Sequence, residues 1–233
     1  AMGTSMPEAA VSITSAIKGS AGITVGNVVG SNIMNILVIL GLTAVITPIA
    51  VQRSTRRFEI PGMIAVSILF LVFGYTGGEV VRFEGIIMWL VFIGYLGYLF
   101  WIAKNNKDEE SGEEDKKWSL PVQLIAIVGG IAAIVLGSDL AVDGATAIAK
   151  AFGMSDRIIG LTIVAFGTSL PELVTSVTAA RRGKADIAIG NIVGSNIFNI
   201  LFVAGTTALI TPVVFEAKFV VDSVIAIVAA VIL

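Results

Sequence analysis

The sequence of 233 residues contains no cysteine and no histidine, and only 14% of its residues are charged. Without cysteine, disulfides, redox pairs and thiolate metal sites are excluded, and without histidine, imidazole proton relays and imidazole metal ligands are excluded. Soluble domains carry about 25% charged residues, so a soluble enzyme and a secreted domain both fit poorly. A bound metal ion would need oxygen ligands, which suit hard cations such as calcium or sodium.

Two further absences narrow the possible functions. The formal net charge is only −2, which argues against a nucleic-acid partner. Gly183-Lys184 is followed by Ala185 rather than by Ser or Thr, so no Walker P-loop is present and ATP-driven pumping is not expected. No constellation of residues supports an enzyme, and we expect no resident cofactor.

Long apolar runs dominate what is present. Hydrophobic residues make up 56% of the chain and the mean hydropathy is +0.94, which predicts an all-α, polytopic membrane protein. We expect spans at 1–17 (partial), 23–47, 59–76, 83–103, 119–138, 157–181, 187–211 and 216–233, with 139–152 extending the fifth. The charge-rich stretch 104–118 is interpreted as a cytoplasmic linker between a first repeat, 1–103, and a second repeat, 119–233.

An internal repeat organises the chain. When residues 1–48 are placed over residues 165–212, 28 of the 48 positions are identical. An odd number of spans separates the two copies, which predicts a helix bundle of two inverted-topology repeats, a plan typical of secondary transporters. With the linker inside, ten Lys and Arg residues lie on the cytoplasmic side and five on the other. By symmetry the chain reads as a fragment of a ten-helix transporter that lacks the first and last helices.

The first repeated motif is Gly-Thr-Ser-x-Pro-Glu, at 3–8 and 167–172. Glu8 and Glu172 stand in apolar segments, where an ionisable residue indicates function, although one copy alone could snorkel to a headgroup. Pro7 and Pro171 have no N–H, so backbone carbonyls one turn earlier become free to face a cation. A proline could equally be a simple packing kink. Helical spacing places Ala1, Thr4 and Ser5 on the face of Glu8.

The second repeated motif is Gly-Asn-x-Val-Gly-Ser-Asn-Ile-x-Asn-Ile-Leu, at 26–37 and 190–201. Its glycines, four residues apart, are interpreted as points of close helix approach. Each copy carries a polar stripe, whose side chains could either form hydrogen bonds between helices or contact an ion. For the serine and the second asparagine of each stripe we favour ion contact, or support of the glutamates. The stripes are Asn27, Ser31, Asn35 and Asn191, Ser195, Asn199.

Together the motifs supply an oxygen cage that fits calcium or sodium. Two facing carboxylates repel each other in a medium of low dielectric constant unless cations or protons neutralise them. One divalent ion or two monovalent ions can do so, and competition for the same charges is a physical route to exchange.

At these motifs, GTSMPE with GNVVGSNIMN and GTSLPE with GNIVGSNIFN, the sequence resembles the sodium/calcium exchanger family of the cation/calcium antiporters. The proton-coupled branch of that superfamily typically has Gly-Asn-x-x-Glu instead. The resemblance implies sodium-for-calcium antiport by alternating access. It also implies calcium ligands at Glu8, Glu172 and the carbonyls of Thr4 and Thr168, sodium ligands at Ser5, Ser169, Ser31, Ser195 and the carbonyls of Ala1 and Ala165, and a central polar pair, Asn35 and Asn199.

One departure concerns Asn199, where many relatives, including potassium-dependent ones, carry Asp. A proton- or potassium-coupled calcium exchanger therefore stays open as an alternative, and a cation channel is a weaker one because inverted repeats favour carriers. We expect a monomer in the lipid bilayer of a prokaryotic cell membrane, with calcium and sodium ions as its partners.

Overall fold

The computed structural model describes residues 1–19, 21–49, 51–105, 119–154 and 165–233. In the first half of the chain these residues form helices with two π-helical segments and one short strand. The elements are α1 Met6–Ile17, α2 Gly22–Ile33, η1 Met34–Leu40, α3 Gly41–Ile46, η2 Thr55–Glu59, α4 Ile60–Gly77, β1 Glu79–Val80 and α5 Arg82–Asn105.

The second half repeats much of this order. Its elements are α6 Leu120–Ala151, α8 Ala165–Thr168, α9 Leu170–Arg181, α10 Ala185–Phe198, η4 Asn199–Ala204, α11 Gly205–Ile210, β2 Val213–Val214 and α12 Ala217–Ile232. Strands β1 and β2 pair antiparallel, with Glu79 opposite Val214. The all-α membrane fold with inverted repeats is therefore confirmed. The two strands are only a short pair, which joins the connection between α4 and α5 to the connection between α11 and α12.

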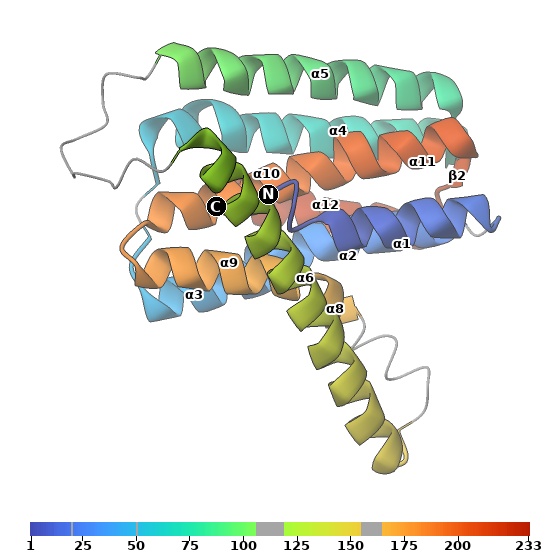
Figure 1. Ribbon diagram of the computed structural model, residues 1–233. Coiled ribbons are helices and arrows are strands. Elements are labelled where there is room, and N and C mark those ends of the chain that lie inside the picture. Colours follow the sequence, from blue (N-terminus) through green and yellow to red (C-terminus); the bar gives the residue numbers. More distant parts are fainter. Residues whose placement is uncertain (20, 50, 106–118, 155–164) are drawn as a thin grey trace.

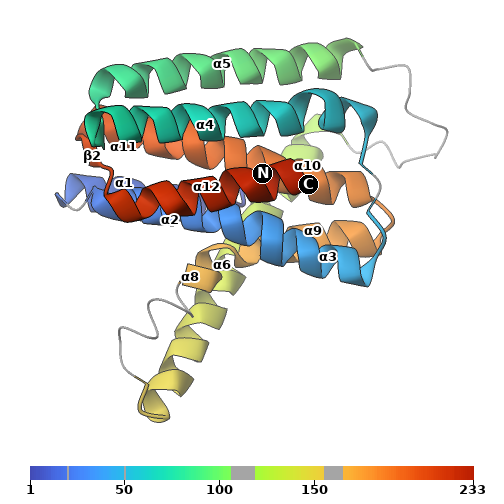
Figure 2. The same cartoon turned by 180° about the vertical axis from the view of Figure 1, so that it is seen from behind.

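Most helices lie side by side in one bundle, whereas α6 crosses it obliquely and its C-terminal half projects away (Figure 1). Seen from behind, α12 runs between α2 and α4 (Figure 2), against both of which it packs. The crossing of α6 is close: a Cβ at Gly3 would lie 2.5 Å from Cδ1 of Ile131. A larger residue at position 3 would therefore require the side chain of Ile131 to move where α6 passes the first motif.

Five helical segments in the described ranges are long and apolar enough to cross a membrane: Gly22–Ile46, Thr55–Gly77, Arg82–Asn105, Leu120–Gly137 and Ala185–Ile210. They match five of the predicted spans, and 139–152 does continue the fifth because α6 is one helix to Ala151. The predicted spans 1–17 and 216–233 correspond to the shorter helices α1 and α12.

The span predicted at 157–181 contains, in its described part, the opened turn that Pro171 led us to expect. Residues 155–164 lie outside the described residues, and beyond them the helix is interrupted between α8 and α9 at Ser169, with φ −93° and ψ 4°. The physical reason is Pro171, which cannot donate a backbone hydrogen bond to the preceding turn.

Contacts between connections show which segments share an end of the bundle. The side chain of Gln52 donates to Asp186 over 2.7 Å, which joins the connection after α3 to the start of α10. At the other end, Arg82 donates to the carbonyl of Ile210 over 3.3 Å, next to the β1–β2 pair. These positions agree with the predicted division of Lys and Arg between two sides. That the first end is cytoplasmic stays a prediction, as do the boundaries of the two repeats and of the linker 104–118, of which residues 106–118 lie outside the described residues.

Candidate cation site

The site begins with two matching interruptions of helix, one in each repeat. Ser5 precedes α1 with φ −87° and ψ 11°, nearly the same as Ser169 before α9. In each case a proline follows two residues later and supplies no N–H to the preceding turn. Non-helical backbone within a membrane protein is tolerated where it is buried in protein or lines a cavity.

The two predicted carboxylates, Glu8 and Glu172, follow these interruptions, and each is only 1% exposed. Serines of the opposite repeat bind them: Ser5 donates to Oε1 of Glu172 over 2.6 Å, and Ser169 donates to Oε1 of Glu8 over 3.3 Å. The hydroxyls of Thr4 and Thr168 also lie near the opposite carboxylates. Neither carboxylate is therefore held by its own repeat's first motif alone.

Other predicted site residues add neutral oxygens. Ser195 donates to Oε1 of Glu172 over 3.3 Å and to the carbonyl of Ala1 over 3.4 Å. The carbonyl of Ala1 also accepts from the hydroxyl of Thr4 over 2.9 Å and from the backbone N–H of Ser5. Ser31, the counterpart of Ser195, is likewise buried. Ala165 is the first residue of α8, in the position that corresponds to Ala1.

Four asparagines form a buried network at the junction of the repeats. Asn35 donates to Oδ1 of Asn196 over 2.9 Å, and Asn199 donates to Oδ1 of Asn32 over 3.2 Å. Asn32 and Asn196 then donate to each other's backbone carbonyls, both over 3.3 Å. All four side chains are at most 4% exposed. The amide nitrogens of Asn35 and Asn199 donate these bonds, so the amide oxygens of the two side chains point away from the network and accept no hydrogen bond.

Four oxygens remain without a donor. Among the buried carboxylate and amide oxygens of the described residues, only Oε2 of Glu8, Oε2 of Glu172, Oδ1 of Asn35 and Oδ1 of Asn199 have no hydrogen-bond partner. A buried acceptor without a partner costs about 1–3 kcal/mol, and more if it is charged. The elements that carry them also contact each other, because α1 packs on η4 and α9 packs on η1. This arrangement can bind a cation.

The site contains two carboxylates, because no three acidic side chains lie close together in the described part of the chain. The remaining ligands for a cation would be neutral oxygens from serine, threonine, asparagine and backbone. This composition suits sodium and calcium, which accept mixed oxygen ligands.

The first asparagine of each stripe acts between helices. Asn27 donates to the carbonyl of Glu8 over 3.0 Å and to Ser12 over 2.8 Å, which ties α2 to α1. Asn191 donates to Ser176 over 3.2 Å and accepts from Thr4 over 3.3 Å. The sequence left open whether Asn27 and Asn191 connect helices or contact an ion, and these bonds favour the connection between helices.

The interpretation of the glycines needs correction. A Cβ at Gly194 would lie 2.8 Å from Cβ of Ala1, which is a close approach, and one at Gly26 would lie 3.5 Å from Phe219, an ordinary contact. A Cβ at Gly30 or Gly190 would meet no atom of the described residues within 4 Å. Glycine spacing alone does not identify which helix face has a neighbour.

Asn32 and Asn196 were not singled out from the sequence, although both stand in the second motif. Their signal was present, because each repeat has the same Asn-x-x-Asn pair and spacing of three places both side chains on one helix face. The π-helical segments η1 and η4 were also missed. They begin at equivalent places, beside Asn35 and at Asn199, where π-helical turns frequently accompany functional residues.

Known proteins resemble this chain along nearly its whole length. The sodium/calcium exchanger protein family model matches residues 1–101 and 122–233. The putative antiporter CaxA of Alkalimonas amylolytica is 41% identical, covering 93% of this chain and 70% of that protein. The sodium/calcium exchanger MaX1 of Methanosarcina acetivorans is 32% identical, covering 91% of this chain and 71% of that protein.

A solved structure has the same fold. The sodium–calcium exchanger NCX_Mj, soaked with 2.5 mM Na⁺ and 0.1 mM Ca²⁺, matches with a TM-score of 0.83 and 33% sequence identity, over 99% of this chain and 74% of that one. This agreement extends over both repeats and both motifs. The chain is therefore an integral membrane protein, and it belongs to the sodium/calcium exchanger family.

Proposed function

We propose that this chain forms the ion-binding core of an antiporter that exchanges sodium for calcium across the membrane by alternating access. The observation that carries the proposal is the set of four buried oxygens without donors, two carboxylate and two amide, placed in matching positions of the two repeats. Water or a protein donor would normally satisfy such groups. A transported cation satisfies them only while it is bound.

The charge of the site supports exchange between a divalent and monovalent ions. Glu8 and Glu172 lie close enough to repel each other, and burial strengthens that repulsion. One calcium ion or two sodium ions would neutralise both carboxylates. Binding of one species therefore competes with binding of the other, and a doubly ionised cage without a cation resists closure.

We assign the ligands as follows. Glu8 and Glu172, with the backbone carbonyls of Thr4 and Thr168, bind calcium. Ser5, Ser169, Ser31, Ser195 and the carbonyls of Ala1 and Ala165 complete the sodium positions, and Asn35 and Asn199 contribute amide oxygens at the centre. The ions in the NCX_Mj structures, Na⁺ with Ca²⁺ or Sr²⁺, are consistent with this assignment because that protein belongs to the same family.

Alternating access is favoured by the inverted repeats. Two half-sites related by a pseudo-two-fold rotation about an axis in the membrane plane can be exposed to opposite sides by the same relative movement. The crossed bonds Ser5–Glu172 and Ser169–Glu8 couple the repeats at the ion site itself, so occupation and rearrangement act on the same contacts.

The test is calcium uptake into sodium-loaded liposomes that contain the full-length protein. A sodium gradient should drive saturable uptake of labelled calcium, and replacing it by a potassium or proton gradient should not. Glu172→Gln should abolish the uptake. The matched control is Glu216→Gln, which removes an exposed carboxylate that pairs with Lys218 near the β1–β2 pair. This variant should leave uptake unchanged.

Unchanged exchange in Glu172→Gln would overturn the proposed site. Uptake driven equally by protons or potassium would overturn the sodium coupling, and non-saturable flux without counterflow would favour the cation channel instead.

A further inference from the structure

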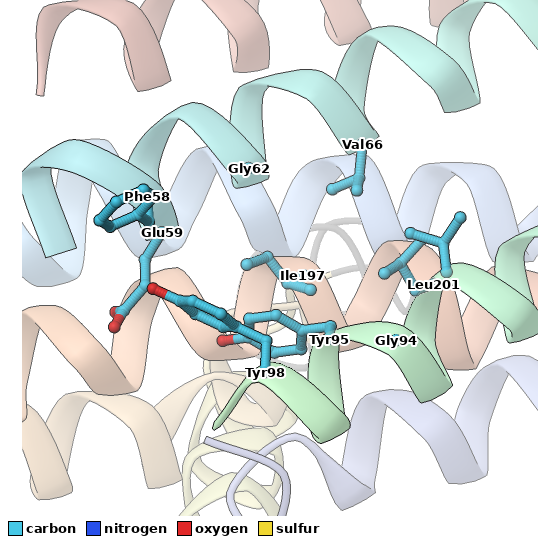
Figure 3. A pocket seen from close by; sticks show the side chains of 10 residues that line it. Phe58, Glu59, Gly62, Val66, Gly94, Tyr95, Tyr98, Ile197 and Leu201 are labelled. Carbon is cyan, nitrogen blue, oxygen red and sulfur yellow. The ribbon is translucent and has the colours of Figure 1, made fainter. Parts of the chain in front are cut away.

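A crevice of about 350 Å³ lies between α4 and α5, with the α10–η4 segment as its floor (Figure 3). It has two chemically different ends. Val66, Ile197 and Leu201 line an apolar end, whereas Glu59, Tyr95 and Tyr98 gather at the other. Its volume falls within the range of ligand pockets, about 300–1,000 Å³. The crevice thus has the form of a site for an amphiphilic molecule.

The polar end lacks a cationic partner. The carboxylate of Glu59 projects toward the tyrosine rings (Figure 3), and it forms no ion pair with any described residue. The hydroxyl of Tyr98 is buried and has no hydrogen-bond partner. The rings of Tyr95 and Tyr98 stack with centroids 6.5 Å apart, and aromatic faces attract cations. A primary ammonium group would satisfy the carboxylate and the phenol oxygen together.

Positive charge stands next to this end. Arg56 and Arg57 are exposed on η2, and the guanidinium of Arg57 lies 5.5 Å from the ring centroid of Phe58. The wide π-helical turn has a local cause, because Pro61 cannot donate to the carbonyl of Arg57. The crevice mouth therefore presents Glu59 to a cation and Arg57, which lies against the lining residue Phe58, to an anion. This is the charge pattern of a zwitterion that carries both an ammonium and a phosphate.

We propose that this crevice binds a phospholipid with a primary-amine headgroup. The ammonium binds Glu59 and the hydroxyl of Tyr98, the phosphate lies at Arg57, and one acyl chain follows the apolar floor. A quaternary ammonium cannot donate the hydrogen bonds that Glu59 and Tyr98 accept, so a choline lipid should bind more weakly. The surrounding bilayer supplies such amphiphiles at high local concentration.

The floor of the crevice is the reverse side of the segment that carries Asn199. Ile197 and Leu201 each stand two residues from Asn199, so a bound acyl chain packs directly on the first turn of η4. Lipid binding would therefore bias the position of a proposed ion ligand. That consequence rests on the proposed function, but lipid binding itself does not.

Lipid retention by the full-length protein tests the proposal without any transport measurement. The purified protein in neutral detergent is mixed with equal amounts of phosphatidylethanolamine and phosphatidylcholine that share the same acyl chains. Bound lipid is then counted by native mass spectrometry. We expect about tenfold preferential retention of the ethanolamine lipid. Glu59→Gln should bring the preference close to one, and Glu216→Gln should leave it unchanged.

A second variant tests the apolar part. Gly94 lines the crevice and a Cβ there meets no atom within 4 Å, so the backbone accepts a side chain at this position and we expect that of Gly94→Leu to occupy the crevice. It should lose both lipids while its thermal unfolding stays near that of the wild type. Equal retention of the two lipids by the wild type, an unchanged preference in Glu59→Gln, or full retention in Gly94→Leu would each overturn the proposal. Stronger retention of phosphatidylglycerol would also overturn it, since the arginines alone would then select the lipid.

Discussion

The two repeats share most of their motif residues, yet their halves of the ion site are not equivalent. Glu172 accepts from Ser5 over 2.6 Å and from Ser195 over 3.3 Å, whereas Glu8 accepts from Ser169 over 3.3 Å. The bonds between Asn35 and Asn196 and between Asn199 and Asn32 differ in the same sense, at 2.9 and 3.2 Å. A duplicated sequence thus gives the same set of proposed ligands in both repeats, while packing decides how closely each side chain is held.

The crossing of these contacts teaches more than their lengths. Each serine of the first motif donates to the glutamate of the other repeat, and each of Asn35 and Asn199 donates to an asparagine of the other repeat. Neither repeat can assemble the site alone. A rearrangement of one repeat against the other must therefore alter the contacts of both glutamates and of Asn35 and Asn199, which is what an exchanger of the proposed type requires.

The largest expected effect comes from neutralising either carboxylate. Glu8→Gln and Glu172→Gln should each weaken calcium-driven sodium flux at least about a hundredfold, because each removes one of the two charges that neutralise the divalent ion. Flux in reconstituted liposomes at varied calcium concentration measures this. If one variant kept near-normal calcium affinity, the two repeats would not share the ion, and the comparison between equivalent half-sites would fail.

The asparagine network gives the next effect. Asn32→Leu removes the acceptor for the amide of Asn199, so that amide can rotate and its oxygen no longer has a fixed direction. We expect about tenfold lower calcium affinity, equivalent to roughly 1.4 kcal/mol. Asn32→Asp keeps an acceptor for Asn199 and should retain more affinity than Asn32→Leu.

Thermal unfolding separates this positioning role from a purely structural one. The two variants at position 32 both lose the donor to the carbonyl of Asn196, and Asn32→Asp in addition buries a carboxyl group. Asn32→Asp should therefore be no more stable than Asn32→Leu, so a higher calcium affinity in Asn32→Asp would not be due to stability. Equal calcium affinities in Asn32→Leu and Asn32→Asp would show that the acceptor does not orient Asn199.

Replacing Ser5 or Ser169, which donate to the glutamates of the opposite repeats, tests whether the two halves of the site differ in strength. Ser5→Ala removes a short bond to a carboxylate, a class worth about 1.5–3 kcal/mol, and should lower calcium affinity about tenfold. Ser169→Ala removes the longer bond to Glu8 and should lower it about threefold. Calcium titration of the two variants under identical conditions decides the order. The reverse order would mean that bond length in the cation-free site does not predict the loss.

Much of this molecule was predictable from its sequence because the repeat preserves chemistry at fixed spacing. The apolar runs predicted the membrane helices, and the paired motifs predicted both glutamates and the serines near them. Sequence could not show that Ser5 binds Glu172 rather than Glu8, because hydrogen bonds between repeats depend on how two distant segments pack. The role of Asn32 could not be predicted from the sequence for the same reason, because its partners, Asn196 and Asn199, are more than 160 residues away along the chain.

The interruption within 157–181 and the crevice beside α4 differ in how far the sequence could predict them. Hydropathy averaged over some 20 residues does not detect the interruption, but Pro171 in the first motif predicts it, because proline cannot donate to the preceding turn. By contrast, Glu59 and Tyr98 stand nearly 40 residues apart on different helices, and only the packing of both α4 and α5 on the α10–η4 segment gathers them at one crevice.

The last expected effect concerns stability rather than ion affinity, and it uses one glycine that both repeats share. Gly30 and Gly194 occupy equivalent motif positions, but a Cβ at Gly194 would lie 2.8 Å from Cβ of Ala1, whereas one at Gly30 would meet no described atom within 4 Å. Gly194→Ala should therefore lower the free energy of unfolding by about 1–3 kcal/mol through overpacking.

Gly30→Ala should instead be neutral or raise the free energy of unfolding by about 0.5–1 kcal/mol, because alanine restricts the unfolded chain and favours helix. Thermal unfolding of the two variants in the same detergent measures the difference. Equal destabilisation by both would mean that the repeats are packed alike around this glycine. In that case the inequality of the two half-sites must arise from the ligand side chains themselves, not from the spacing of the helices that carry them.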